Sequence, residues 1–357
     1  MAGVAHPPKN PGSPTRQRGR VKLGVGVLAV AGLLLSVGLI MHYGAADIAH
    51  ALRGIGWGMA LVMVAHLAQV WLSGQGWHAM AQVEQVGAVR IFALARWVRE
   101  SVAGLLPLTQ IGGEVVSIRI VVLHGYRSGI AAGSMIADLG AQIASQGVFT
   151  LLGLAMLIID GHQGPVVEWT LLGLVASLSV LPGFFLAQRR GLLHATEAFF
   201  IRLADKFPAF EGTSLEGLHD SIHRIFRQPL ALLKSFNAHL LSWLLGAFEI
   251  WLILHFLGAE VSVREALVIE SLSQVVRSVA FAIPGALGVQ EGGFMLIGAI
   301  YGLSPQICLA LSLAKRVREL LLGIPALLAW QWMEGRRLWF QRTGRGAEVG
   351  SRDRQNV

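Results

Sequence analysis

Ionisable side chains stand inside segments of this chain that are otherwise apolar, where burial is costly and charge usually serves a function. Glu114 and Glu291 each lie seven residues after a proline, within a glycine-rich stretch. Arg277 lies seven residues before the second proline, Pro284. An arginine holds a phosphate through two parallel hydrogen bonds, and a glutamate accepts hydrogen bonds from an amine or takes up a proton. These residue types predict a site for a phosphate, an amine or protons.

Further polar residues lie on a predicted apolar helix. Asp138, Gln142 and Gln146 recur every four residues and therefore share one helix face. Lys315 stands 177 residues after Asp138, and Arg318 lies about one helical turn beyond Lys315. We expect this polar stripe and the two cations to face the interior of a helical bundle, where they add to the same charged cavity.

A structural role is the alternative for these charges. Ion pairs inside the bundle, for example Lys315 with Glu319 at i, i+4, would fix helix register without binding any ligand. Hydrogen bonding between helices is the interpretation we favour for four polar residues of one apolar segment: His66, Gln69, Gln75 and His78.

The candidate residues belong to a segment that occurs twice, 177 residues apart (284 − 107). The stretch 100–107 reads ESVAGLLP, and the stretch 277–284 reads RSVAFAIP. Matching positions hold the same residue type: Pro107 and Pro284, Glu114 and Glu291, Gly125 and Gly302, His78 and His255. A chain built from two related, proline-broken halves commonly has a transport site where the halves meet.

The composition places these halves in a membrane. The chain is 54% hydrophobic and 14% charged, whereas soluble domains carry about 25% charged residues. Each predicted span reaches the roughly 20 residues that cross a bilayer; the spans cover 21–41, 57–80, 129–159, 166–187, 237–257 and 305–332. The net charge of +8 comes from basic residues in the two tails and the loop 188–235. This pattern predicts cytoplasmic termini rather than nucleic-acid binding.

Two apolar segments, 91–123 and 266–303, are interrupted at Pro107 and Pro284, and each half is too short to cross the hydrocarbon. We expect two re-entrant helical hairpins, the first dipping from the cytoplasm and the second from outside. Gly113 and Gly288 allow close backbone packing near their tips. The fold expected is an all-α integral membrane protein with about six spanning helices and two hairpins in inverted repeats. Two short, tilted spans per segment are the alternative.

The predicted domains follow from these segments. Residues 1–20 form a disordered basic tail, 21–333 the membrane domain and 334–357 a second cytoplasmic tail. The first repeat covers about 57–160 and the second about 237–333. The loop 188–235 alternates apolar and basic residues and predicts amphipathic helices on the cytoplasmic surface. The sequence contains no nucleotide-binding glycine loop, nucleophile elbow or zinc cluster, so we expect no cofactor and no enzymatic activity.

Two motifs resemble a known family. The run from Pro284 through Gly288 to Glu291, and the triplet ending in Gly113-Glu114, resemble signatures of the flippase-like membrane region of lysylphosphatidylglycerol synthases. Within that family the chain is most similar to stand-alone members associated with hopanoid biosynthesis. Bifunctional members add a C-terminal aminoacyl-transferase domain, and here only a tail follows the last span. The resemblance therefore implies lipid translocation without synthase activity.

These observations together predict a lipid flippase of the bacterial inner membrane, moving a hopanoid, an aminoacyl-phospholipid or a polyprenyl-phosphate lipid. Its expected partners are membrane lipids and lipid-synthesis enzymes, without nucleic acid. An enzyme of isoprenoid lipid synthesis and a non-catalytic membrane subunit are the alternatives. The predicted substrate-binding residues are Pro107, Gly113, Glu114, Asp138, Arg277, Pro284, Gly288, Glu291, Lys315 and Arg318.

Overall fold

The computed structural model describes residue 41 and residues 53–106, 110–161, 218–279 and 288–353. Across these ranges the chain forms helices and turns, without a strand. The predicted span 166–187, nearly all of the span 21–41, and the two prolines Pro107 and Pro284 lie outside the described residues.

The described helices fall into two series of four with a short helix between them. The first series is α3 (Gly58–Ala81), α4 (Val89–Leu105), α5 (Gln110–Leu123) and α6 (Ser128–Ile159). Helix α9 (Leu218–Phe226) precedes the second series. That series is α10 (Pro229–Phe256), α11 (Val263–Val279), α12 (Val289–Gly298) with the 3-10 turn η3 (Ala299–Tyr301), and α13 (Pro305–Asp353).

Four of the predicted spans correspond to helices of the structure, but the helices begin or end at different residues from those predicted. Helix α3 covers the span 57–80 and α6 covers 129–159. Helix α10 begins earlier than predicted because Pro229 occupies its first turn, where the fixed φ of proline suits a helix start. Helix α13 continues past the predicted end at 332 to Asp353. The predicted C-terminal tail thus extends a membrane helix.

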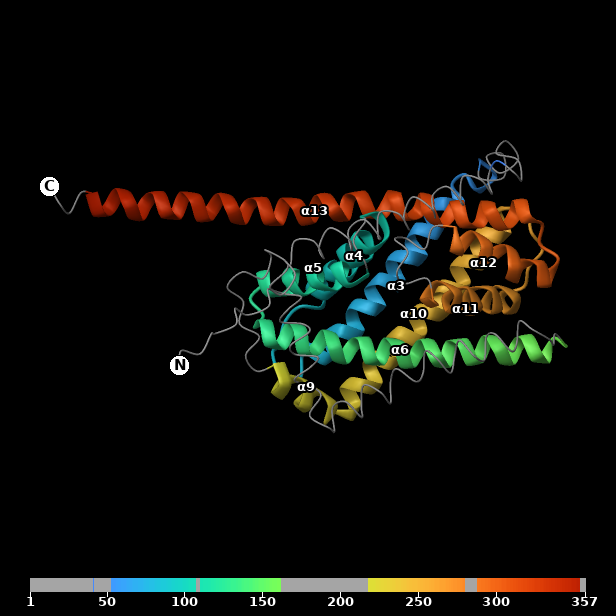
Figure 1. The fold of residues 1–357 in the computed structure, drawn as a ribbon, viewed down its shortest axis with the longest axis horizontal. Helices are drawn as coiled ribbons and strands as arrows, with labels where there is room; N and C mark the ends of the chain where they lie inside the picture. The colour runs from blue at the N-terminus through green and yellow to red at the C-terminus, as the bar shows by residue number, and fades with distance from the viewer. Residues whose placement is uncertain (1–40, 42–52, 107–109, 162–217, 280–287, 354–357) are drawn as a thin grey trace, which may run out of the picture.

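The two series have the same contact pattern. Helices α3 and α10 pack against each other in the centre of the molecule. Helix α4 contacts α3, α5 and α13, while α11 contacts α10, α12 and α6. In Figure 1, α4 and α5 lie at one end of the molecule, α11 and α12 lie at the other, and α6 and α13 run along opposite sides. Each pair of short helices is therefore held against the long helix of the other series.

The turns before the two long helices are also alike. Gly125 precedes α6 with a φ of 93°, and Gly302 precedes α13 with a φ of 71°. Residues with a Cβ rarely adopt this left-handed conformation, so glycine is required at both turns. The glycine match in the sequence repeat thus reflects a shared backbone conformation.

The two larger of the three apolar cores among the described residues lie towards the two ends of the molecule. One gathers around Trp77, Phe92 and Tyr126, whose rings meet edge to face with Phe92 in the middle and centroids 5.2 Å apart. The other gathers around Ile250, Leu272 and Phe294. Since each core draws mainly on one series of helices, the polar residues lie where the two series meet.

The outer faces of the long helices are apolar as well. Large exposed hydrophobic residues lie on α3, α6, α10 and α13, for example Leu67, Leu151, Phe248 and Leu328. Within the described residues, α6 and α10 are the helices long and apolar enough to cross a membrane. A helical bundle with an apolar outer surface and a polar interior is typical of a membrane protein.

Helix α9 lies within the segment 188–235, which the sequence predicted to form amphipathic helices on the cytoplasmic surface of the membrane. Its apolar residues Leu218, Ile222 and Ile225 are buried, and Ser221 lies against Gly133 of α6. The helix is amphipathic as predicted, but its apolar face is covered by protein rather than by a membrane surface.

Candidate functional site

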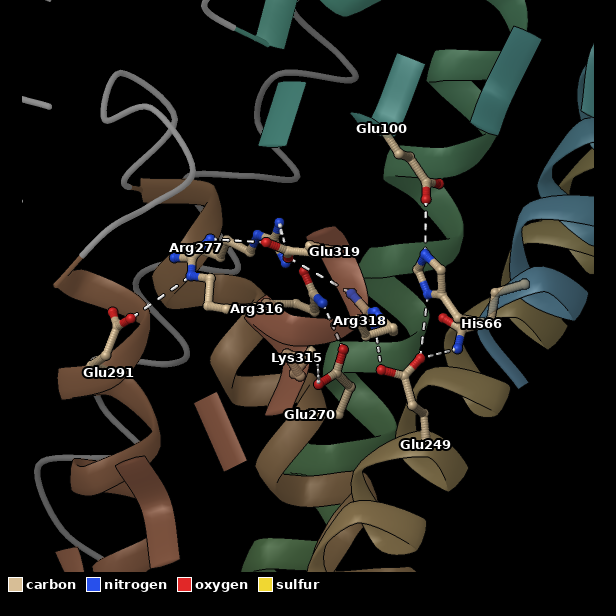
Figure 2. A network of polar contacts seen from close by, with 12 residues as sticks. His66, Glu100, Glu249, Glu270, Arg277, Glu291, Lys315, Arg316, Arg318 and Glu319 are labelled. Atoms are coloured by element: carbon tan, nitrogen blue, oxygen red, sulfur yellow. Dashed lines mark hydrogen bonds and ion pairs between the residues drawn. The ribbon is translucent and has the colours of Figure 1, made fainter. Parts of the chain in front are cut away.

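Four charged residues within one and a half turns of α13 form the centre of the site: Lys315, Arg316, Arg318 and Glu319. Because neighbouring positions on a helix point in different directions, these side chains contact residues on three other helices, α10, α11 and α12. Figure 2 shows their connections. The central network, as we call it, also contains His66 of α3, Glu100 of α4, Glu249 of α10, Glu270 and Arg277 of α11, and Glu291 of α12.

Glu249 is the most enclosed acid of the network, with a side chain that is 1% exposed. Arg318 forms an ion pair with one of its oxygens. The other oxygen accepts a hydrogen bond from Gln69 Nε2 at 2.7 Å and lies 3.3 Å from His66 Nδ1. A carboxylate buried at this depth is stable only with such partners, and they come from both series of helices.

Lys315 forms a second buried ion pair, with Glu270. Its Nζ lies 3.0 Å from Glu270 Oε2 and 5.5 Å from the centre of the Phe294 ring. Gln274 donates a hydrogen bond to the other Glu270 oxygen at 2.7 Å. The lysine charge is thus neutralised on α11, and not by Glu319 of its own helix as the local alternative predicted.

Glu319 lies among three arginines. Arg316 donates to its Oε2 at 3.0 Å, and Arg277 and Arg318 each have a guanidinium nitrogen 3.7 Å from its Oε1. Of these cations Arg277 is the most accessible, with 29% of its side chain exposed. Three guanidinium groups thus share one carboxylate at this point, and we call them with Glu319 the arginine cluster.

Glu291 joins the network from the second pair of short helices. Its Oε2 accepts a hydrogen bond from the backbone N–H of Gly288 at 2.8 Å and so caps α12. Its other oxygen lies 3.8 Å from Arg316 Nε. Gly288 has a φ of 77° at this cap. The glutamate therefore connects the start of α12 to the arginine cluster.

Asp138 is the centre of a separate buried site between α6, α10 and α4. Its Oδ1 accepts a hydrogen bond from Ser235 at 2.8 Å and lies 2.9 Å from His239 Nε2. Arg96 lies 3.7 Å from its other oxygen and donates to Gln142 at 3.0 Å. The predicted polar stripe therefore faces the interior at Asp138, while Gln146, further along it, donates to the exposed Ser278 of α11.

Glu114 lies apart from Glu291, although the two match in the repeat. It forms an ion pair with Arg99 of α4, which ties the short helices α4 and α5 together. A Cβ on the neighbouring Gly113 would lie 2.7 Å from the Arg99 carbonyl oxygen. Only glycine permits the two backbones to approach so closely. Of the predicted residues, four meet in the central network: Arg277, Glu291, Lys315 and Arg318.

The predicted hydrogen bonding between helices holds for two of four residues. His66 and Gln69 contact Glu249 on α10. His78 instead contacts the Gly87 carbonyl oxygen just after its own helix, and Gln75 is exposed.

Several residues of these sites were not singled out from the sequence. They are Glu249, Glu270, Arg316, Arg96 and His239. A signal was present, because each is an ionisable residue within a largely apolar segment, and such residues usually face a partner in the bundle interior.

Comparison with known families agrees with the fold. Residues 23–326 match the family described as the lysylphosphatidylglycerol synthase TM region. The chain belongs to this family. It is therefore a membrane protein of a lipid-related family, and its apolar outer faces are the surfaces that lipid covers. No curated protein matches the sequence significantly.

Proposed function

We propose that this protein moves a polar lipid between the leaflets of the bacterial inner membrane. The observation that carries the proposal is the arginine cluster, in which Arg277, Arg316 and Arg318 surround Glu319. A phosphate offers guanidinium groups the same charged oxygens as a carboxylate and is held in the same bidentate way. A lipid phosphate that approaches through the accessible Arg277 would displace Glu319 from its arginines.

The arginine cluster also favours some of the expected lipid classes over others. Aminoacyl-phospholipids and polyprenyl phosphates carry a phosphate, which a plain hopanoid lacks. The acids Glu249, Glu270 and Glu291 lie close to the cluster and suit a head group that also carries an amine. We therefore propose an anionic or aminoacylated phospholipid as substrate. The association with hopanoid synthesis suggested by the sequence would then concern the partner enzymes.

The arrangement of helices supports an inverted repeat. Helices α6 and α13 begin at matching positions of the repeat, Ser128 and Pro305. The pairs α4–α5 and α11–α12 lie at opposite ends of the molecule (Figure 1). Helices α4 and α5 have 17 and 14 residues, or about 25 and 21 Å at 1.5 Å per residue. Both fall short of the roughly 30 Å of a bilayer core, which supports re-entrant hairpins. The proposal of cytoplasmic termini rests on the basic residues of the two tails.

Opposite sidedness of the two hairpins is a direct prediction. Cysteines introduced at Ser128 and Ser304, in a Cys308→Ser background, should react with a membrane-impermeant maleimide from the cytoplasm and from outside, respectively. Ser128 is the first residue of α6 and Ser304 directly precedes α13, so each position follows a pair of short helices. Labelling of both positions from the same side would exclude the inverted repeat.

The phosphate role of Arg277 predicts graded losses of transport. In vesicles with a labelled phospholipid, Arg277→Lys should slow movement about tenfold, because an ammonium group cannot replace a bidentate contact. Arg277→Ala should nearly abolish it. Arg227→Lys, at an exposed arginine outside the network, is the control and should match the wild type. Equal rates for Arg277→Lys and wild type would argue against a bidentate phosphate contact.

A non-catalytic membrane subunit is the second candidate. It is favoured by one observation, that Lys315, Arg318 and Arg277 each have an acidic partner within the protein. Ion pairs of this kind also hold helices in register without any substrate. If Arg277→Ala leaves both lipid movement and membrane levels unchanged, this second function is the better one.

A further inference from the structure

His66 lies between two carboxylates that come from different series of helices. Its Nδ1 is 3.3 Å from Glu249 Oε2 on α10, and its Nε2 is 3.2 Å from Glu100 Oε2 on α4 (Figure 2). The imidazole therefore connects the first pair of short helices to the central helix of the second series.

These two contacts require an additional proton. An ionised carboxylate only accepts hydrogen bonds, and a neutral imidazole has one N–H group and one lone pair. With His66 neutral, one of its nitrogens would direct a lone pair at a carboxylate. Both contacts form together when the ring is an imidazolium and donates from both nitrogens. The geometry thus places one exchangeable proton among Glu100, His66 and Glu249.

The charges around His66 are consistent with that proton. Among the helices that pack on α3, α10 contributes Glu249, α4 contributes Glu100, and α13 contributes Arg318, which pairs with Glu249. Helix α6 contributes Asp138 further along α3, where Ser235, His239 and Arg96 surround it. The central network contains five glutamates and four permanent cations, so an imidazolium at His66 makes it neutral.

The two carboxylates differ in their access to water. The Glu100 side chain is 35% exposed, whereas that of Glu249 is enclosed and also held by Arg318 and Gln69. If His66 loses its proton, the contact with Glu249 is therefore retained and the contact with Glu100 is lost. The link from α4 through His66 to Glu249 is then broken. Because α4 also packs on α13, the change reaches the helix that carries Arg316 and Arg318.

We propose that His66 is a proton-binding site that couples lipid movement to a proton gradient, with Glu100 as its connection to water. Histidine and carboxylate chains inside membrane proteins commonly serve as proton relays. In each cycle His66 takes up a proton that originates from water on one side of the membrane, and the proton then passes from His66 Nε2 through the Glu100 carboxylate to water on the other side. Reprotonation of His66 rebuilds the link between α4 and α10. The coupling rests on the proposed function, since it supplies the energy for the same lipid movement.

A gradient experiment tests the coupling. The full chain is reconstituted in vesicles with tail-labelled phosphatidylglycerol. A pH difference of about one unit is imposed across the vesicle membrane, and valinomycin with potassium clamps the membrane potential. If one proton moves with each lipid, a pH difference of one unit should make the labelled lipid about tenfold more abundant in one leaflet than in the other. His66→Gln and Glu100→Gln should give an equal distribution under the same gradient. His255→Gln, at an exposed histidine stacked on Trp251, should retain the unequal distribution.

The outcomes separate the coupling from the function itself. A wild type that equilibrates the lipid but shows no asymmetry under the gradient overturns the coupling and leaves the lipid movement standing. Retained asymmetry in both His66→Gln and Glu100→Gln overturns it as well. A wild type that moves no label under any condition overturns the proposed function, and the coupling with it. Histidine ¹⁵N NMR tests the proton site separately. The His66 signal is assigned as the one that disappears in His66→Gln. In the wild type it should report a doubly protonated ring at neutral pH, and a neutral ring would contradict the site.

Discussion

Glu249→Gln should lower the free energy of unfolding by about 3–5 kcal/mol, the usual cost when a buried ion pair loses one member. The substitution keeps the size of the side chain and removes its charge. Arg318 would remain buried, with Glu319 at 3.7 Å as its nearest other acid. Unfolding by sodium dodecyl sulfate in mixed micelles measures the loss. Glu260→Gln, at an exposed glutamate shortly after α10, is the control and should change little.

A second substitution separates the lost charge from general disruption. Adding Arg318→Met to Glu249→Gln should restore most of the stability, because a buried pair replaced by uncharged side chains of similar size is often neutral or stabilising. If the double variant is instead less stable than Glu249→Gln alone, Arg318 has another role in the fold. The ion pair is then not what stabilises this helix contact. The double variant should still fail in transport, since it lacks one arginine of the cluster.

Glu291→Gln should reduce lipid movement by about tenfold, or about 1.4 kcal/mol of the barrier, while the protein accumulates normally. A glutamine at this position of α12 can still accept the hydrogen bond from the Gly288 N–H, so the helix start is preserved. What is lost is the negative charge beside Arg316. Vesicle assays and membrane levels should be measured together.

The matching variant at the other glutamate should behave differently. Glu114→Gln removes the charged partner of Arg99, a buried residue whose ion pair joins α4 to α5. We therefore expect lower membrane levels and an unstable protein. Normal accumulation of Glu114→Gln with full loss of transport would show that the two glutamates act alike, as their positions in the repeat suggest. Failure of Glu291→Gln to accumulate would make that residue structural.

The helices and their matched turns were predictable because they depend on local properties. Apolar segments of sufficient length form α3, α6 and α10, and the left-handed turns before α6 and α13 require Gly125 and Gly302. The length of α13 was not predictable in this way. Its charged continuation does not resemble a span, and its four glycines lower its helix propensity.

The charged residues of the site were partly predictable, but their partners were not. Burial cost alone singles out Arg277, Lys315 and Arg318. Which acid neutralises each of them depends on which helices become neighbours. Glu249 lies 69 residues from Arg318 and 183 from His66, so no local pattern links them. The local pair of Lys315 with Glu319 was plausible, but close packing of α11 brings Glu270 nearer to the lysine.

Helix α13 is long enough that a small change in its tilt at the central network moves its far end by a large distance. The helix has 49 residues, which is about 73 Å and more than twice the thickness of a bilayer core. Its charged residues that meet the network end at Glu319, and Asp353 lies 34 positions further on, about 51 Å along the axis. Pro325 lies between the network and this end, and if the helix stays straight through it, a tilt of about 10° at the network displaces the far end by about 9 Å. A rearrangement of ion pairs inside the membrane would then become a movement large enough for another protein to detect.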